Sequence, residues 1–297
     1  MNDHSIPFSI FLLVLFLSGC NNPEKNLLPF DFNHPDEVIN LPKTLHEISG
    51  ITFYKKNELA CVQDEKGKIF FYDIKKEKLR NTVSFGSDND YEGIANINDT
   101  LYVLCSNGVI SQVDALQENV YTNSYKTFLS KENNCEGLCY DFKRNCLLVA
   151  CKGKPEKGTA PRGNKAIYRF NPVTGILDET PAYQIDPDSV IAHITSSDTP
   201  NIFSRLMGKN SDKIKNRFDP SDLAIDPFSD DIYLLSAEGK TLLVMTYTGN
   251  IKFALRLNPE IYKQPEGIIF SSDGDLFISD EGRGGRANLI RLRRNSF

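Results

Sequence analysis

The sequence predicts an all-β protein, a β-propeller of about five four-stranded blades closed by an N-terminal strand. Three observations support this fold class. Short apolar runs alternate with tight polar turns along the chain after residue 27. A unit with a small or acidic residue early in its first run recurs about every 44 residues, with one interval twice as long, at Gly50, Gly93, Gly137, Asp222 and Gly267. Repeats of roughly 40 to 50 residues with four short strands are typical of propeller blades.

The length and charge of the chain limit what it can be. It has 297 residues, a formal net charge of −5 and a pI of about 5.5. A chain of this length can bury a substantial core as one domain. Nucleic-acid-binding domains carry a basic surface, which this composition does not favour. We therefore expect a monomer with no nucleic-acid partner.

The first residues resemble an export signal that ends in a lipidation site. Phe8–Leu17 is an apolar run too short for a transmembrane helix, and it suits a signal peptide. Leu17-Ser18-Gly19-Cys20 then resembles a bacterial lipobox, although the seven residues before the run contain no Lys or Arg. We expect a signal peptide at residues 1–19 and a lipidated Cys20 with a polar tether at 20–26. An ordinary cleaved signal and a misassigned start are the alternatives.

Lipidation would decide where the protein works. Acyl chains on Cys20 would anchor it to a membrane through buried methylene groups. We expect a location in the cell envelope, lipid-anchored to the inner or outer membrane of a Gram-negative bacterium, facing the periplasm or the cell surface.

The remaining residues, 27–297, are expected to form a single propeller domain. Leu27–Leu41 offers one extended segment outside any complete repeat. Such a strand commonly closes a propeller by joining the last blade, which removes an exposed edge. The last repeat has only three runs, so it has room for this strand. The repeats follow in order as residues 48–85, 92–128, 136–185, 221–257 and 266–293.

The third repeat carries two insertions. Lys152–Asn164 is a loop rich in Gly and Pro between its second and third strands. The second insertion, at about 188–218, mixes loop signals with partly helical spacing. A sixth blade hidden in this second insertion is the alternative to five blades, and the loop signals favour five.

Six cysteines remain after Cys20, an even number in a compartment that permits disulfides. Cys135 and Cys151 would face each other across a hairpin that turns at residues 142–144, so this pair is the best disulfide candidate. The alternative is that cysteines among apolar strand residues fill small spaces in the core. Its clearest examples are Cys61, Cys105, Cys139 and Cys146.

The geometry of a blade gathers carboxylates at one end of the axis. The two innermost strands are antiparallel, so the first strand begins where the second ends. Several carboxylates in such a mouth would repel one another, and Ca²⁺ with oxygen ligands in irregular geometry would relieve this repulsion. The alternative is that the glutamates accept backbone N–H bonds between blades. The candidate metal ligands are Glu92, Glu136, Glu266, Glu47, Asp64, Glu65, Asp280 and Glu281.

Basic residues and histidines accompany these carboxylates. Lys152, Arg283 and Arg286 fall in loops on the same face, where they would frame an anionic ligand over a bound cation. His46 and His193 are weak candidates for a general base. Solvated loop side chains are the alternative for all five residues.

Short motifs recur at or near the inner strands of the repeats, namely Glu47-Ile-Ser-Gly-Ile, Val62-Gln-Asp-Glu65, Asp90-Tyr-Glu-Gly-Ile-Ala95, Asp219-Pro-Ser-Asp-Leu-Ala224 and Pro265-Glu-Gly-Ile. Together they resemble the YjiK/CarP family, also called SdiA-regulated, which comprises periplasmic or lipid-anchored bacterial propellers. The resemblance covers roughly residues 41–293, and it implies calcium-linked behaviour but no settled enzymatic activity. By fold analogy it invites comparison with β-propeller phytases. Pro265-Glu266-Gly267 also resembles the metal-binding glutamate of gluconolactonase-type and paraoxonase-type propellers.

Two functions are compatible with these features. The first is a calcium-linked binding propeller whose mouth holds a small anionic ligand or a protein partner. The second is a metal-dependent hydrolase of phosphate esters or lactones, in which the cation would polarise the scissile group. The sequence contains no Gly-x-Ser-x-Gly and no His-Glu-x-x-His motif. This favours binding, and leaves enzymatic activity open.

Overall fold

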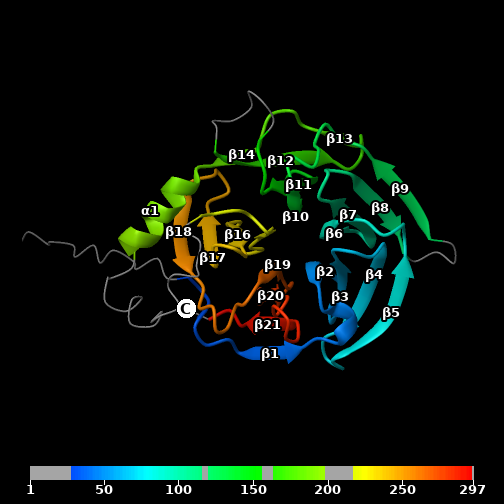
Figure 1. The fold of residues 1–297 in the computed structure, drawn as a ribbon, viewed down its shortest axis with the longest axis horizontal. Helices are drawn as coiled ribbons and strands as arrows, with labels where there is room; N and C mark the ends of the chain where they lie inside the picture. Colours follow the sequence, from blue (N-terminus) through cyan, green and yellow to red (C-terminus); the bar gives the residue numbers. More distant parts are fainter. Residues whose placement is uncertain (1–27, 116–119, 156–162, 198–216, 296–297) are drawn as a thin grey trace, which may run out of the picture.

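The computed structural model describes residues 28–115, 120–155, 163–197 and 217–295. These residues form a β-propeller in which five antiparallel sheets surround a central axis (Figure 1). The prediction of five blades is confirmed, and the alternative of six is wrong. The signal peptide and tether expected at residues 1–26 lie outside the described residues.

In the first, second and fourth blades, strands follow one another outward from the axis in the order of the chain. The first blade contains β2 (Ile48–Lys55), β3 (Glu58–Gln63), β4 (Lys68–Asp73) and β5 (Lys78–Ser84). The second contains β6 (Tyr91–Ile97), β7 (Thr100–Cys105), β8 (Ile110–Asp114) and β9 (Tyr121–Tyr125). The fourth contains β15 (Asp222–Ile225), β16 (Ile232–Ser236), β17 (Thr241–Met245) and β18 (Ile251–Arg256).

The third blade has a divided outer edge. Its strands are β10 (Cys135–Asp141), β11 (Cys146–Cys151), β12 (Lys165–Asn171), β13 (Ile176–Leu177) and β14 (Tyr183–Ile185). Both β13 and β14 pair with β12, at opposite ends of that strand. The third repeat, expected at residues 136–185, therefore ends with β14, and β13 extends the same edge.

The fifth blade is completed by the N-terminal strand. It contains β19 (Pro265–Phe270), β20 (Leu276–Asp280), β21 (Asn288–Leu292) and β1 (Glu37–Asn40). β1 is antiparallel to β21, with Val38 opposite Ile290. The predicted closure by a strand within residues 27–41 is confirmed, and this strand covers the edge that the last blade would otherwise expose.

The core lies between neighbouring blades. Five clusters of buried apolar side chains fill the five interfaces, and the cluster between the fifth and first blades contains residues of β1, β2, β20 and β21. Middle strands are covered on both faces, so β11 and β16 are buried at every position. Outer strands face solvent, and β5 is mostly exposed. The four cysteines expected in the core are buried, as predicted.

Close contact at the axis explains the recurrent glycine. A Cβ on Gly93 would lie 2.8 Å from the backbone N of Leu138, and one on Gly50 would lie 2.8 Å from the Cα of Gly93. The inner strands therefore approach so closely that a side chain would displace the neighbouring backbone. The fourth blade has Asp222 at this position, and its Oδ2 accepts a hydrogen bond of 2.8 Å from the backbone N–H of Ile268 in the fifth blade.

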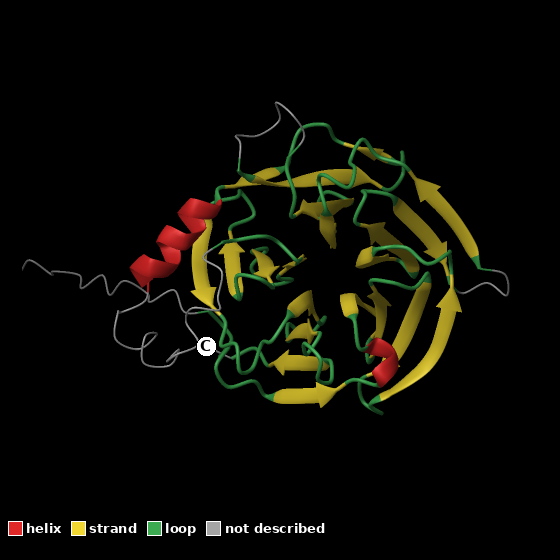
Figure 2. Ribbon diagram, in the orientation of Figure 1, coloured by secondary structure: helices red, strands yellow, loops and turns green. Residues whose placement is uncertain are grey.

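Among the residues that the structure describes, helical structure is confined to two segments, which the ribbon places away from the axis (Figure 2). A 3₁₀ turn, η1 (Lys43–Leu45), follows β1, and α1 (Pro187–Ser197) begins the second insertion. α1 packs against β18 at the perimeter, where Val190 and Ile194 join the core between the third and fourth blades. Within the described ranges, no helix is long and apolar enough to cross a membrane.

Candidate ligand-binding mouth

Three β-bulges place three glutamates at equivalent points of the propeller. On β6 the pairing with β7 passes from Tyr91 directly to Gly93, so Glu92 is the extra residue. The same shift makes Glu136 the extra residue on β10 and Glu266 the extra residue on β19. A bulge bends the strand and redirects a side chain. We call Glu92, Glu136, Glu266 and Lys152 the acidic mouth.

Side chains supply the hydrogen bonds seen at these carboxylates. Ser49 Oγ donates to Glu92 Oε2 at 3.0 Å. Asn134 Nδ2 donates to Glu136 Oε1 at 2.6 Å, and Gln264 Nε2 donates to Glu266 Oε1 at 2.8 Å. The alternative that the glutamates serve as acceptors for backbone N–H groups therefore receives no support from these contacts.

The hydrogen-bond partners of the glutamates follow a pattern in the sequence that could have identified them. In three blades a polar residue stands two positions before the glutamate, namely Asp90, Asn134 and Gln264. Asn134 and Gln264 are amide donors, whereas Asp90 is a second acid. Burial and the nearby Glu136 raise the pKa of Glu92 most, and Asp90 raises it further.

Burial and mutual repulsion raise the pKa values of the carboxyl groups in the acidic mouth. Loss of water raises the pKa of Glu92 and of Glu136, and Glu136 raises the pKa of Glu92 further. Burial, followed by the nearby Glu136, raises the pKa of Glu266 to about 8. Lys152 Nζ lies 3.2 Å from Glu136 Oε1 and opposes the rise at Glu136. Lys152 also opposes the rise in the pKa of Glu266.

A second acidic group lies between the fifth, first and second blades. Burial raises the pKa of Asp64 to about 6, and the charges of Glu47, Glu65, Glu281 and Asp90 add to this. The Oδ1 atom of Asp64 is buried without a hydrogen-bond partner. An open hollow of about 390 Å³ is lined by Asp64, Glu65 and Asp90 together with Lys66, Asp88 and Asn89. The candidate ligands are therefore divided between this group and the acidic mouth.

Asp280 has a structural role. Its Oδ2 accepts the backbone N–H of Gln264 at 3.0 Å, and its Oδ1 accepts the backbone N–H of Gly282 at 3.1 Å. Its side chain is fully buried, and burial raises its pKa although both bonds favour the charged form. Asp280 therefore fixes the loop entering β19, the strand that carries Glu266.

The expected calcium ligands do not form a ready-made site. Among the described residues, no group of three or more His, Cys, Asp or Glu side chains is arranged to hold a metal ion. The oxygen atoms of the acidic mouth are of the kind that Ca²⁺ prefers. One of them, Glu136 Oε1, is engaged by Lys152. Calcium binding therefore requires Lys152 and the carboxylates to rearrange.

The basic candidates differ in position. Lys152 belongs to the acidic mouth, whereas Arg283 is exposed and donates from Nε to Gln264 Oε1 at 2.9 Å. Arg286 is exposed on the same loop. Lys240 was not anticipated: it is 6% exposed, and burial, with the nearby Arg283, lowers its pKa to about 8.

The two histidines do not belong to one site. His46 is exposed after η1. Burial raises the pKa of Glu281, and the nearby His46 opposes this rise. His193 was expected above the mouth, but it lies on α1, which packs against β18 at the perimeter. That placement was wrong because the insertion begins with an amphipathic helix that buries its apolar face on the fourth blade. The rest of the insertion, 198–216, lies outside the described residues.

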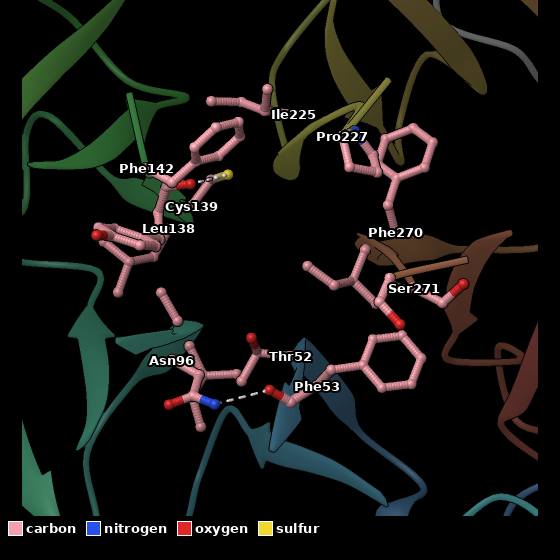
Figure 3. Close-up of a pocket in the computed structure, with 15 residues that line it drawn as sticks. Thr52, Phe53, Asn96, Leu138, Cys139, Phe142, Ile225, Pro227, Phe270 and Ser271 are labelled. Atoms are coloured by element: carbon pink, nitrogen blue, oxygen red, sulfur yellow. Dashed lines mark hydrogen bonds between the residues drawn. The ribbon is translucent and has the colours of Figure 1, made fainter. Parts of the chain in front are cut away.

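The other end of the axis has the opposite chemistry. A cavity of about 240 Å³ lies where the inner strands end (Figure 3). All five blades line it, with apolar groups such as Phe53, Leu138, Phe142 and Phe270. Asn96 at its wall donates to the backbone O of Phe53 at 2.9 Å. The residues that line this cavity include no carboxylate.

No protein-family model and no curated protein matches the chain. Solved structures do match it. A chain of a mitotic checkpoint complex is 12% identical, aligns over 100% of both chains and gives a TM-score of 0.51. A streptogramin B lyase is 15% identical over 86% of this chain and 97% of its own, with a TM-score of 0.48.

A further match spans only part of a longer protein. A structural-genomics protein of unknown function from Bacteroides thetaiotaomicron is 15% identical over 79% of this chain, with a TM-score of 0.46. The chain covers 52% of the length of that protein. At 12% identity, the likeness to the chain of the mitotic checkpoint complex supports the fold and nothing more specific.

Proposed function

We propose that this protein is a binding propeller of the cell envelope, whose acidic mouth takes up a cation, with Ca²⁺ as the candidate, together with a small ligand or a protein partner. The observation that carries the proposal is the clustering of the three bulge glutamates: burial and then the nearby Glu136 raise the pKa of Glu92 and of Glu266, and Glu136 forms an ion pair with Lys152. Buried carboxylates are costly unless they are protonated or paired. A cation would satisfy them and release Lys152 toward solvent.

The loop after β20 supports a ligand with an anionic group. Arg283 and Arg286 are exposed there, and Arg283 is joined through Gln264 to Glu266. A cation below and guanidinium groups above would together bind an oxyanion. The ligand that we propose therefore carries an anionic group.

Membership of the YjiK/CarP family and a lipid anchor at Cys20 are part of the same proposal. They are supported by the motifs that begin the inner strands and by the lipobox-like Leu17-Ser18-Gly19-Cys20. The anchor would hold the propeller at the envelope membrane.

Metal-dependent hydrolysis of phosphate esters or lactones is the second candidate, and one observation favours it. Burial and the nearby Glu136 raise the pKa of Glu266 to about 8, in a group that also contains Glu92 and Lys152. A carboxyl group that titrates near neutrality can transfer a proton. Calcium-dependent turnover of a phosphate ester or a lactone by the purified protein, lost in Glu266→Gln, would favour hydrolysis over binding alone.

Thermal unfolding with and without calcium tests the binding proposal. A ligand that binds only the folded protein stabilises it by roughly 2.7 kcal/mol at a hundredfold excess over its dissociation constant. We expect calcium to raise the melting temperature of the parent protein by several degrees relative to chelator. Glu266→Gln removes a charge while keeping the shape and the contact with Gln264, so it should lose most of this increase.

Glu179→Gln is the matched control, because Glu179 is exposed and lies between β13 and β14, outside the acidic mouth. It should retain the full response to calcium. A parent protein that melts at the same temperature with calcium and with chelator would overturn the calcium part of the proposal.

A further inference from the structure

Two cysteines face each other at the start of the third blade. Cys135 on β10 is the register partner of Cys151 on β11. The backbone N–H of Lys152 donates to the O of Asn134 at 2.9 Å, which makes Cys135 and Cys151 a pair without backbone hydrogen bonds between them. In antiparallel sheets such pairs have the smaller Cα separation. The two Sγ atoms lie 3.7 Å apart, and both residues are fully buried.

The other four buried cysteines lack this arrangement. Cys139 is opposite Leu148, Cys146 is opposite Asp141, and Cys105 is opposite Tyr91. Cys61 is opposite Ile51 on one side and Phe70 on the other. Within the described part of the chain, only one cysteine pair is therefore in position for a direct cross-link.

We propose that Cys135 and Cys151 form a disulfide that links the two innermost strands of the third blade. A disulfide requires the sulfur atoms to approach to about 2.05 Å, with Cα atoms roughly 4.4 to 6.8 Å apart. Facing residues of a narrow antiparallel pair meet the backbone requirement. Rotation of the side chains then brings the sulfur atoms together, and the backbone keeps its register.

The oxidant is a disulfide, small or carried by a protein. A Cys135 or Cys151 thiolate attacks this disulfide and releases one thiol, which gives a mixed disulfide. The second cysteine loses its proton and attacks the mixed disulfide, so the new S–S bond forms and a second thiol leaves. Two protein thiols are oxidised and one disulfide is reduced to two thiols.

Burial determines when this exchange takes place. Contact with Cys151 and loss of water raise the pKa of Cys135 well above its ordinary value, so the folded thiol is a poor nucleophile. The exchange therefore belongs to folding, before the second and third blades pack together, because Cys135 lies in the core between them.

The location of the pair gives the disulfide a consequence for the acidic mouth. Cys135 directly precedes Glu136, and Cys151 directly precedes Lys152, whose Nζ lies 3.2 Å from Glu136 Oε1. The cross-link fixes the two backbone segments from which this ion pair extends. Its effect on cation binding rests on the proposed function, whereas the disulfide itself does not.

Thiol mapping after oxidative refolding tests the proposal. The purified full chain is unfolded under reducing conditions, refolded in a buffer of reduced and oxidised glutathione, and alkylated after denaturation without reductant. We expect Cys135 and Cys151 to escape alkylation and to appear in one linked peptide by mass spectrometry. Cys61, Cys105, Cys139 and Cys146 should all be alkylated.

Variants distinguish a specific link from general protection. Cys139→Ser is the matched control within the same blade, and it should retain the linked peptide. Cys135→Ser should leave Cys151 alkylated and should melt lower than the oxidised parent, because closing a loop of about 15 residues restricts the unfolded chain. Alkylation of all six cysteines that follow Cys20 in the refolded parent, or a link between other cysteines, would overturn the proposal. Neither outcome depends on calcium.

Discussion

Carboxylates of the same type have different roles in this propeller, and the position in the strand decides which. Glu92, Glu136 and Glu266 are bulge residues that receive bonds from side chains. Asp280 ends a strand and accepts two backbone N–H groups. The sequence alone placed all four at one end of the axis. It could not separate the two roles, because the bulge depends on the register between neighbouring strands.

Serine at the equivalent position shows how the other two blades differ. Ser49 Oγ donates to the backbone O of Glu92 at 2.8 Å, and Ser221 Oγ donates to the backbone O of Pro265 at 3.0 Å. Each serine is therefore hydrogen-bonded to the inner strand of the next blade. The acceptor is Glu92 itself in one case and Pro265, the residue before Glu266, in the other. From the sequence, these serines can be recognised only as occupying the position at which the other three blades have glutamate.

One residue decides the proposed location. Replacement of Cys20 by Ala removes the only side chain that a lipobox would lipidate, so the variant should lose its acyl anchor. We expect most of the variant to leave the membrane fraction, whereas the parent partitions with membranes. Fractionation of cells followed by immunoblotting measures this. Equal membrane partition of both proteins would contradict lipidation at Cys20.

At the level of elements, the blades were predictable because each repeat has its own turns. The turn between β19 and β20 illustrates this: Gly274 has a φ of 87°, and the backbone N–H of Ser271 donates to the O of Asp275 at 2.8 Å. The divided outer edge of the third blade was less predictable. Outer strands are short and exposed, so their apolar pattern is weak.

Deletion of residues 27–41 tests the importance of β1. Without β1, strand β21 presents unpaired backbone groups along an edge that can join another chain. Ile39 and Leu41 are also buried between the fifth and first blades, so their apolar contacts are lost. We expect the variant to form oligomers or aggregates in size-exclusion chromatography. Deletion of residues 21–26 is the control and should remain monomeric, and a monomeric, cooperatively folding 27–41 deletion would speak against the closure role.

At the scale of the whole molecule, the raised carboxyl pKa values predict how stability changes with pH. The pKa of Glu266 rises from an ordinary 4.5 to about 8, and that of Asp64 rises from 3.8 to about 6. The folded state therefore binds these protons more tightly than the unfolded chain. Their contribution to stability is complete below the ordinary pKa and is lost as the pH rises through the folded value.

In chelator, we accordingly expect the melting temperature to fall by several degrees between pH 5 and pH 8, as measured by thermal unfolding at unit intervals. Glu266→Gln should reduce this slope because Gln does not titrate. A melting temperature that rises across the same interval would contradict this prediction. It would show that groups with lowered pKa values govern the pH dependence of stability instead of these carboxyl groups. The interval stops at pH 8 because Lys240, whose pKa is lowered to about 8, adds the opposite slope above it.

The closure of the propeller joins segments from opposite parts of the chain. Arg291 Nη1 lies 3.4 Å from Glu37 Oε2, although the two residues are 254 positions apart in sequence. During synthesis, β1 emerges long before β21, so the first strand has no partner until almost the whole chain has followed it. Contacts of such long sequence separation form slowly, since they pay the entropy of closing a large loop. Ring closure is therefore expected to be a late folding step, during which the first and last strands are both open to mispairing or to a protecting chaperone.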